Sequence, residues 1–195
     1  MYRLRTAIQA DAKVIADWFP THESAVSWGG PDVPTNFVAT WLANQYAGSS
    51  GRHFVLVDES GWICGTCAVR SLENPRRMHV SQLAVAPTMQ GRGLGRRLLD
   101  LVVILARSAG AGKLTLFVYE GNAAARRLYE RYGFVISANE RAKASPYGEM
   151  LPMELDLTSA DKATPADSGT SACRAGNDPS IPHKSPSRHR PKGRK

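Results

Sequence analysis

The first 157 residues combine two hydrophobic periodicities. Between Leu98 and Leu105 apolar residues recur at i, i+3, i+4 and i+7, which indicates one apolar face of a helix. Shorter apolar or alternating runs, such as 2–7 and 78–86, indicate strands. On this basis we predict strands over 2–7, 53–58, 62–71, 78–86, 114–119, 134–137 and 149–157, and helices over 11–18, 35–46, 96–109 and 123–132.

Capping residues support several of these boundaries. Asp11, Thr35 and Asn122 stand where helical runs begin, and their side-chain oxygens can accept hydrogen bonds from the first turn. Gly133 suits the left-handed residue that follows a helix. The segment 19–34 contains the letters Trp-Gly-Gly-Pro and is predicted to be a loop.

The resulting order is β-α-α-β-β-β-α-β-α-β-β. Its first half reads as antiparallel, and its later strands are connected through helices. We therefore expect the α/β class, with a central, mostly antiparallel mixed sheet and helices on both faces. A chain of 195 residues is expected to form one folded domain, which the pattern places at 1–157.

Residues 158–195 have a different composition. They are rich in Ser, Pro, Gly and Thr, have few large apolar residues, and hold eight Lys or Arg against three Asp. Five of the chain's eight net positive charges therefore fall in this segment. Such a composition cannot offset the entropy of folding, so a disordered basic tail is expected, with nucleic acid as one candidate partner.

The remaining composition indicates a cytoplasmic protein without a membrane partner. Residues 1–5 are polar and no apolar signal region follows them, and the apolar run 101–106 is far too short to span a bilayer. Three cysteines do not form a disulfide framework. Cys64 and Cys67 fall within a predicted strand, so no redox or metal site is expected.

The candidate chemistry begins with the loop 90–95, Gln-Gly-Arg-Gly-Leu-Gly, between a predicted strand and a predicted helix. Its three glycines allow backbone N–H groups to approach an anion closely, and the helix N-terminus adds roughly half a positive charge. Arg92, Arg96 and Arg97 have the same sign. The loop is therefore predicted to bind phosphate.

Two common nucleotide motifs do not fit this loop. The dinucleotide fingerprint is G-x-G-x-x-G, whereas the spacing here is G-x-G-x-G. Gly112 and Lys113 resemble the end of a Walker loop, but that motif requires Gly at Arg107 and Ser or Thr at Leu114.

Three motifs in order resemble the GCN5-related N-acetyltransferase (GNAT) family. The loop 90–95 is similar to the family's (Arg/Gln)-x-x-Gly-x-(Gly/Ala) motif, and Leu-Ala-Val-Ala-Pro at 83–87 is similar to the strand before it. Residues 122–129, followed by Tyr-Gly-Phe at 132–134, resemble the next signature. The resemblance implies an acyl-CoA N-acyltransferase fold, acetyl-CoA as acyl donor and an amine as acceptor, without a metal.

The resemblance also implies roles for individual residues. The pyrophosphate of acetyl-CoA would be held by Gln90, Gly91, Arg92, Gly93, Leu94, Gly95 and Arg96. The pantetheine arm would lie along Leu83, Ala84 and Val85, with Asn122 nearby. Acetyl transfer to an amine also requires stabilisation of the departing thiolate, and the phenol of Tyr129 suits that step.

The general base is left open. Many members of the family have a Glu where this chain has Ser81. His79 shares the strand parity of Ser81 and titrates in a suitable range, and Glu73 stands just before that strand. A water chain to Gln82 is a further alternative.

The acceptor is also left open. We expect its walls to come from 21–34, with His22, Glu23, Trp28 and Asp32, and from 141–148. An amine-bearing small molecule, a peptide or a protein would fit, and the chain is expected to be a monomer or homodimer. Two alternatives to an enzyme are a non-catalytic acetyl-CoA sensor and a nucleic-acid contact through the tail.

Overall fold

The computed structural model describes residues 1–34, 36, 38–48, 52–72 and 76–158. The chain divides into two units, Met1–Ala163 and Thr164–Lys195, and the fold described below is that of the first. The predicted basic tail lies outside the described residues except for Thr158, as do the predicted cap Thr35 and the candidate base Glu73.

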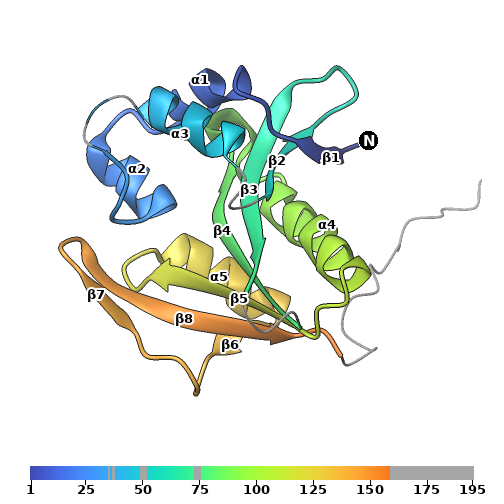
Figure 1. The fold of residues 1–195 in the computed structure, drawn as a ribbon, viewed down its shortest axis with the longest axis vertical. Coiled ribbons are helices and arrows are strands. Elements are labelled where there is room, and N and C mark those ends of the chain that lie inside the picture. Colours follow the sequence, from blue (N-terminus) through green and yellow to red (C-terminus); the bar gives the residue numbers. More distant parts are fainter. Residues whose placement is uncertain (35, 37, 49–51, 73–75, 159–195) are drawn as a thin grey trace, which may run out of the picture. The chain divides into compact units, whose positions relative to one another are not determined.

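The described strands and helices follow the predicted order with two additions, α2 and β7 (Figure 1). Their bounds are β1 Arg3–Thr6, α1 Asp11–Ala16, α2 His22–Gly29, α3 Val38–Ala47, β2 Arg52–Val57, β3 Ile63–Ser71, β4 Arg77–Val85, the 3₁₀ helix η1 Pro87–Met89, α4 Leu94–Ser108, β5 Lys113–Tyr119, α5 Ala123–Tyr132, β6 Val135–Ile136, β7 Lys143–Ser145 and β8 Gly148–Asp156.

One sheet joins all the described strands in the order β1-β2-β3-β4-β5-β8-β6, with β7 paired to β8. All its pairs are antiparallel except β4 with β5. The mixed, mostly antiparallel sheet predicted from the sequence is therefore confirmed. The parallel pair is short: it joins Arg77–His79 to Lys113–Thr115 and then stops. Beyond it, β4 and β5 spread apart toward α2 (Figure 1).

A bulge in β4 accompanies this separation. Thr66 of β3 pairs with Ala84, whereas Ala68 pairs with Ser81, so β4 contains an extra residue in between. Gln82, inside the bulge, has φ of 52°, a left-handed value that non-glycine residues rarely adopt. Bulges bend a strand and redirect its side chains. This one lies at the point where β4 departs from β5.

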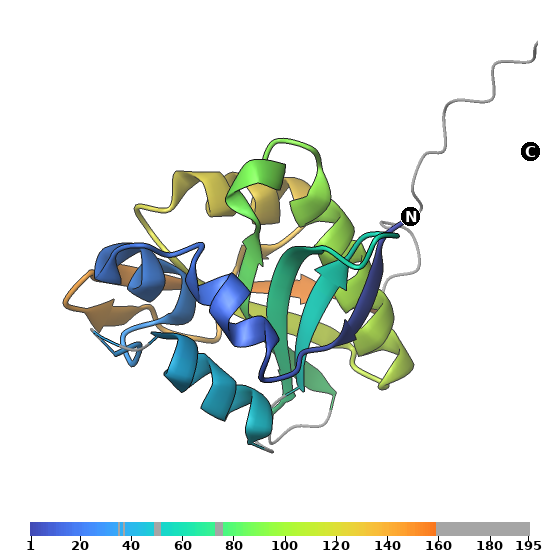
Figure 2. The same cartoon turned by 90° about the horizontal axis from the view of Figure 1, so that it is seen from above.

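Helices cover both faces of the sheet (Figure 2). The apolar face predicted within 96–109 is only partly the buried face of α4: Leu98 and Val102 are fully buried in the main core, whereas Leu101 and Leu105 are partly buried against it. On the other face, Ile15 of α1 and Leu42 of α3 form a second core with β2. None of the helices among the described residues is long and apolar enough to cross a membrane.

The structure corrects the prediction of a loop over 19–34, because half of that segment is helix α2. A capping box begins this helix: the Thr21 hydroxyl accepts from the Ser24 N–H, and the Ser24 hydroxyl accepts from the Thr21 N–H. Only Ala25 and Val26 are fully buried, so the helix has a weak periodic signal. Strand β7 was missed for a similar reason, since it is a three-residue, mostly exposed edge strand.

The prediction that Asp11 caps the first helix is also wrong. Ala10 is the N-cap, and Asp11 is the first helical residue. Its buried carboxylate accepts two hydrogen bonds from Arg5, at 2.6 and 2.8 Å, and one from the Ile8 N–H at 2.9 Å. Burial opposes ionisation, but the hydrogen bonds from Arg5 and Ile8 outweigh it and lower the pKa of Asp11.

Replacing Asp11 by Asn is therefore expected to destabilise the fold by about 2 kcal/mol at neutral pH, because a charge-assisted pair is lost. Urea unfolding measures this difference. The lowered pKa means that the contribution of Asp11 is present above its ordinary pKa of 3.8 and is lost as pH falls through the folded value. Asp17→Asn is the control, since the exposed Lys13–Asp17 pair is worth less than about 0.5 kcal/mol. Equal effects of the two substitutions would contradict this account.

Candidate active site

A cavity of about 950 Å³ lies where β4 and β5 separate. Its size is at the upper end of the range for small-molecule and cofactor sites. The walls come from six parts of the fold: α2 with the segment before it, β4, the loop 87–95 with the start of α4, β5, α5 with its cap, and β8. The lining residues from β4 and the glycine loop include Leu83, Ala84, Val85, Gln90, Gly91, Gly93, Leu94, Gly95 and Arg96, and those from α5 and its cap include Asn122 and Tyr129.

The loop before α4 has the conformation that an anion site requires. Gly91 and Gly93 have φ of 75° and 77°, and Gly93 is the left-handed N-cap of α4. A Cβ atom at either position would meet nothing within 4 Å, so the space over the loop is open. Gly95 serves a different purpose, since a Cβ there would lie 2.9 Å from Leu128 Cδ2. The third glycine therefore allows α4 to pack closely on α5.

The basic residues beside the loop differ in position. Arg96 lines the cavity, and its guanidinium lies 5.5 Å from the centroid of the Tyr132 ring. The Tyr132 hydroxyl in turn donates to Asp100 at 3.0 Å. Arg92 is exposed and is not part of the cavity wall, unlike the rest of the predicted loop. Arg131 of α5 lines the cavity and was missed, because no sequence motif distinguishes it from its basic neighbours.

The edge of β4 faces the cavity beyond the end of its pairing with β5. Ala84 and Val85 pair with β3 on one side only, because the β4–β5 ladder ends at His79. The Gln90 side chain returns to this edge and donates to the Val85 carbonyl at 3.4 Å. An extended, amide-containing chain can therefore lie along β4 in the place that a continuing β5 would occupy.

Tyr129 and Asn122 reach the cavity from α5. The Asn122 side chain accepts from the Ala125 N–H at 3.1 Å, which confirms it as the N-cap. Tyr129 is 7% exposed, and its ring lies 5.7 Å from that of Phe134. Burial, with a smaller contribution from nearby Cys67, raises the pKa of Tyr129 to about 12. The phenol is therefore neutral and able to donate a hydrogen bond at any physiological pH.

His79 lies in the cavity wall on β4 and is 7% exposed. Its Nδ1 is 3.0 Å from the Thr115 hydroxyl, which can donate to the Met78 carbonyl at 3.3 Å. That arrangement favours the tautomer with the proton on Nδ1, which leaves Nε2 as an acceptor. Burial and the positive charges of Arg70, Lys143 and Arg77 lower the pKa of His79 to about 4. The ring is therefore neutral at pH 7.

Of the other positions considered for the general base, two line the cavity and one lies outside the described residues. Ser81 and Gln82 both line the cavity beside His79. Glu73 lies outside the described residues. Among the residues that the structure describes, no group of three His, Cys, Asp or Glu side chains is placed to hold a metal ion.

The expected acceptor walls are only partly those observed. Trp28, Ser24 and Ser27 of the predicted segment 21–34 line the cavity, together with two residues before it that were not predicted, Trp18 and Phe19. His22, Glu23 and Asp32 are not among the lining residues, and neither is any residue of 141–148. The missed residues Trp18 and Phe19 lie where the helix predicted over 11–18 meets the loop predicted over 19–34.

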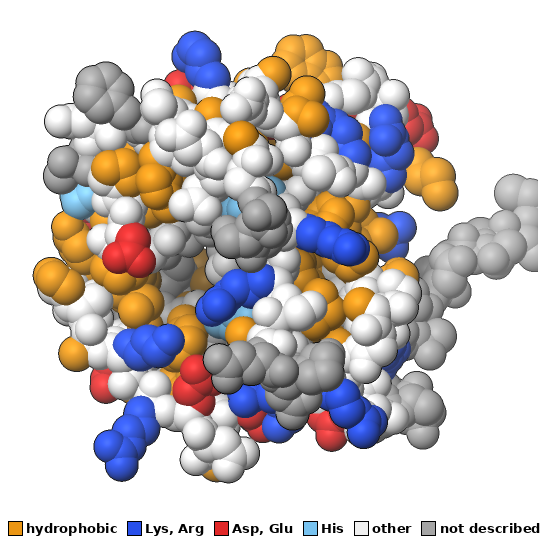
Figure 3. Space-filling model, in the orientation of Figure 1, with side chains coloured by type: hydrophobic (Ala, Val, Ile, Leu, Met, Phe, Trp, Pro, Cys, Tyr) orange, Lys and Arg blue, Asp and Glu red, His pale blue; other side chains and the backbone are white. Residues whose placement is uncertain are grey.

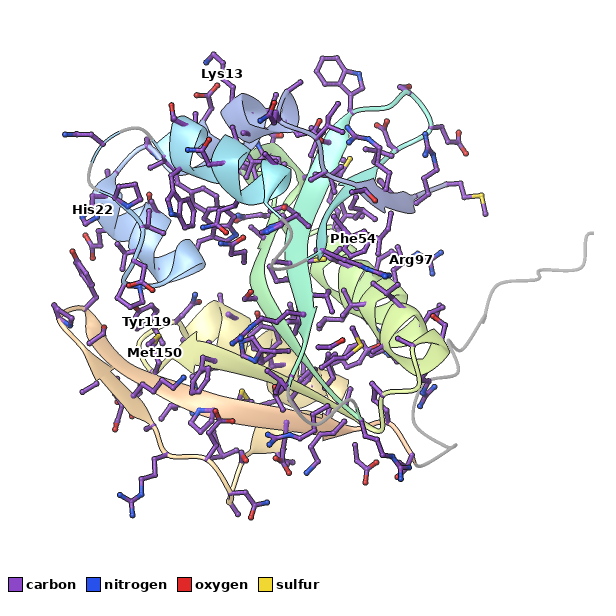
Figure 4. The ribbon with its side chains drawn as sticks, viewed as in Figure 1. Lys13, His22, Phe54, Arg97, Tyr119 and Met150 are labelled. Carbon is purple, nitrogen blue, oxygen red and sulfur yellow. The ribbon has the colours of Figure 1, made fainter. Side chains whose placement is uncertain are left out.

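The β7–β8 hairpin nevertheless contacts α2. The Tyr147 hydroxyl is 3.4 Å from His22 Nδ1, and their rings pack edge to face. Figure 4 places His22 on α2, opposite Tyr119 and Met150 at the ends of β5 and β8. Met150 of β8 and its pairing partner Tyr119 of β5 both line the cavity. Tyr147, at the turn of the β7–β8 hairpin, does not.

Comparison with known proteins identifies this architecture. A family model described as "Acetyltransferase (GNAT) family" matches residues 15–134, a span that includes the glycine loop, Asn122 and Tyr129. The chain belongs to the GNAT acetyltransferase family. The predicted fold class and the predicted N-acetyltransferase activity are thereby confirmed.

Curated relatives and solved structures agree with this assignment. The chain is 28% identical to L-amino acid N-acyltransferase MnaT of Escherichia coli, over 84% of this chain and 97% of that protein. It is 30% identical to L-methionine sulfoximine/L-methionine sulfone acetyltransferase of Salmonella typhimurium, over 77% of this chain and 90% of that protein. A spermidine N-acetyltransferase from Vibrio cholerae, solved with CoA and spermine, has the same fold, with a TM-score of 0.64, 22% identity and coverage of 80% and 95%.

The environment of His79 predicts how stability changes with pH. The pKa of His79 is about 4 in the fold and 6.5 in the unfolded chain, so between these values the unfolded state binds the extra proton. The free energy of unfolding is therefore expected to fall as pH is lowered from 6.5 toward 4. By about pH 4.5, protonation of His79 in the unfolded chain should account for a loss of about 2–3 kcal/mol.

Urea unfolding of the wild type and of His79→Gln, each at about pH 7 and about pH 4.5, isolates this contribution. The wild type should lose more stability than the variant between the two conditions, because other titrating groups cancel in the comparison. Equal losses would contradict the burial of a neutral imidazole.

Proposed function

We propose that the cavity binds acetyl-CoA and that the enzyme transfers the acetyl group directly to a primary amine, without a covalent enzyme intermediate. The observation that supports this most strongly is the continuity of the cavity. The glycine loop, the unpaired edge of β4 and Tyr129 line the same space. Those three features correspond to the pyrophosphate, the pantetheine arm and the thioester of one extended donor.

The donor is held mainly by backbone groups in this proposal. The first N–H groups of a helix have no partner within it, and the space around a Cβ at the neighbouring Gly91 and Gly93 is open. An anion there would also benefit from the dipole of α4. Arg96 adds a formal charge at the same end of the cavity. The amides of pantetheine would pair with the edge of β4 near Leu83–Val85.

In the transfer step the amine nitrogen attacks the thioester carbonyl carbon and forms the C–N bond, which gives a tetrahedral intermediate. The intermediate then collapses, and the C–S bond breaks. The sulfur leaves with the bonding electron pair, and the nitrogen loses one proton. A phenol with a pKa of about 12 is a weaker acid than a thiol, whose pKa is about 8.5. Tyr129 therefore stabilises the thiolate chiefly as a hydrogen-bond donor, and complete proton transfer from the free phenol is uphill.

His79 has a restricted role in this scheme. With a pKa of about 4 it cannot hold a proton taken from an ammonium group of pKa about 10. The amine must therefore enter as the free base, or lose its proton to water. Neutral His79 can accept a hydrogen bond from the bound amine through Nε2 and orient its lone pair toward the thioester.

Replacing Tyr129 by Phe should lower kcat about 10²-fold and change the Kd of acetyl-CoA less than about threefold, because the lost hydrogen bond forms only as sulfur becomes negative. Thiol release from acetyl-CoA measures the rate, and calorimetry measures binding. Tyr46→Phe is a matched control: the pKa of Tyr46 is also raised to about 12 by burial, but Tyr46 does not line the cavity. Parallel losses of kcat and binding in Tyr129→Phe would contradict the assigned role.

Replacing Gly93 by Val should raise the Kd of acetyl-CoA by at least about tenfold, because a β-branched side chain cannot readily adopt φ of 77° and would project over the anion site. Gly61→Val is the control. Gly61 has φ of 85° and open space around it, but it lies in the β2–β3 hairpin away from the cavity. Tight acetyl-CoA binding by the Gly93→Val protein would rule out the loop as the pyrophosphate site.

A non-catalytic acetyl-CoA sensor is the second candidate, and the specific observation in its favour is Ser81 in place of the family's Glu. The two functions differ in wild-type turnover. An enzyme releases thiol from acetyl-CoA when supplied with a suitable amine, whereas a sensor binds acetyl-CoA without amine-dependent release.

A further inference from the structure

The cavity wall offers no carboxylate to a bound cation. Among the described lining residues there is no Asp or Glu, and the ionisable groups are His79, Arg96, Arg131 and tyrosine phenols. An alkylammonium group has a full positive charge, and burying that charge without a partner is costly. A neutral amine needs no such partner, so this wall favours an acceptor that arrives uncharged.

The charges around His79 act in the same direction. Arg70 is the partner of His79 across the β3–β4 ladder, and Arg77 precedes it on β4. After burial, these two charges and that of Lys143 on β7 are the causes that lower the pKa of His79. Lys and Arg side chains lie beside atoms of His near the middle of the face in Figure 3. The carboxylate of Glu140, 3.7 Å from Arg77, offsets only one of the three charges. The net charge near His79 is therefore positive and repels an ammonium group.

A second acid near His79 is engaged by partners of its own. Glu154 is the cross-strand neighbour of Thr115, whose hydroxyl contacts His79 Nδ1. Its carboxylate accepts hydrogen bonds from the Lys113 ammonium at 2.7 Å and from the Ser137 hydroxyl at 2.8 Å. These two bonds are the main causes that lower the pKa of Glu154. Glu154 therefore does not reverse the positive charge near His79.

Aromatic side chains supply much of the remaining surface. Phe19 and Trp28 line the cavity, and their rings stack with centroids 4.3 Å apart. Phe117 of β5 also lines it, and its ring centroid lies 5.8 Å from that of His79. The Lys143 ammonium already covers one face of Phe117, at 3.9 Å from the ring centroid. These surfaces suit a flat neutral ring better than a further cation.

We propose that the acceptor is an aromatic amine, whose nitrogen is uncharged at neutral pH because its lone pair is delocalised into the ring. This inference rests on the proposed acetyl transfer and adds the acceptor class to it. The ring packs among the aromatic side chains of the wall, and the amino group lies beside His79. An alkylamine with a pKa of about 10 is almost entirely charged at pH 7, so only a small fraction of it is in the form that this cavity accepts.

His79 is matched to an acceptor of this kind. The amine nitrogen becomes positively charged as its bond to the thioester carbon forms. Because Nδ1 is engaged by Thr115, Nε2 of His79 is the ring nitrogen left to accept a proton. The protonated nitrogen of an aromatic amine is a strong acid, so even a weak base can take its proton. The C–S bond then breaks, the sulfur leaves with the electron pair, and the proton passes from His79 to water or to the thiolate.

Three amines test the acceptor class in the full-length enzyme with acetyl-CoA. Aniline has an aromatic ring and a weakly basic nitrogen. Benzylamine keeps the ring but has a strongly basic nitrogen, and cyclohexylamine has neither the aromatic ring nor the weak base. We expect kcat/KM at pH 7 to be at least about tenfold higher for aniline than for either alkylamine. Between about pH 6.5 and about pH 8.5 the value for aniline should stay level, whereas that for benzylamine should rise with its free-base fraction.

Lys143→Gln tests the role of the positive charges. Removing one charge near His79 weakens the repulsion of an ammonium group, so the ratio of kcat/KM for aniline to that for benzylamine should fall about threefold. Lys13→Gln is the matched control. Lys13 pairs with Asp17 on the surface of α1, far from β7 in Figure 4, and its loss should leave the ratio unchanged. Equal ratios in the two variants would overturn the role of the charges.

His79→Gln tests the proton transfer. Glutamine can accept a hydrogen bond but cannot hold a proton, so kcat for aniline should fall about 10²-fold and kcat for benzylamine less than about tenfold. The Kd of acetyl-CoA should stay within about threefold of the wild-type value, which shows that the fold and the donor site are intact. Equal losses of kcat for the two amines would overturn the role of His79 as the base.

The acceptor class and the proposed function fail in different ways. An alkylamine turned over as well as aniline at pH 7 would overturn the aromatic-amine assignment and leave acetyl transfer intact. Absence of amine-dependent thiol release with all three amines would overturn the proposed function, and this inference with it.

Discussion

The early end of the β4–β5 ladder is the constraint on which the site depends. The two strands pair over only three positions, Arg77–His79 with Lys113–Thr115, and the bulge at Gln82 turns β4 away. A backbone conformation of this kind costs free energy and persists only where its surroundings hold it. Here β3 holds one edge of β4 and β8 holds the far edge of β5. The gap is thus a fixed part of the sheet, and the cavity follows from it.

That gap brings two different environments into one cavity. At one end the N-terminus of α4 and Arg96 provide positive potential over open glycines. Another part of the wall is aromatic, with Trp28 of α2 and Trp18 and Phe19 before it. His79 and Tyr129 lie in the wall of the same cavity, and burial moves their pKa values in opposite directions, to about 4 and about 12. Both side chains are therefore uncharged at neutral pH, as an attack by a neutral amine requires.

The donor half of the site could be predicted from the sequence because its determinants are local. The loop 90–95 and its helix are consecutive in the chain, and Asn122 caps the helix that contains Tyr129. The opposite wall could be predicted only in part: Trp28 was expected there, but the helix that contains it was not, because α2 begins with a short capping box and buries only Ala25 and Val26. The pKa of His79 was equally beyond the sequence, since Thr115, its hydrogen-bond partner, comes 36 residues later.

A crystal structure of the protein with acetyl-CoA would test the central claim most directly, by showing whether the gap between β4 and β5 holds the donor. The account predicts pyrophosphate oxygens within hydrogen-bond distance of the backbone N–H groups of residues 91–95. It also predicts the pantetheine arm along Leu83–Val85 and the thioester sulfur within reach of the Tyr129 hydroxyl. Acetyl-CoA bound elsewhere, with the glycine loop unoccupied and β4 free of pantetheine, would contradict it.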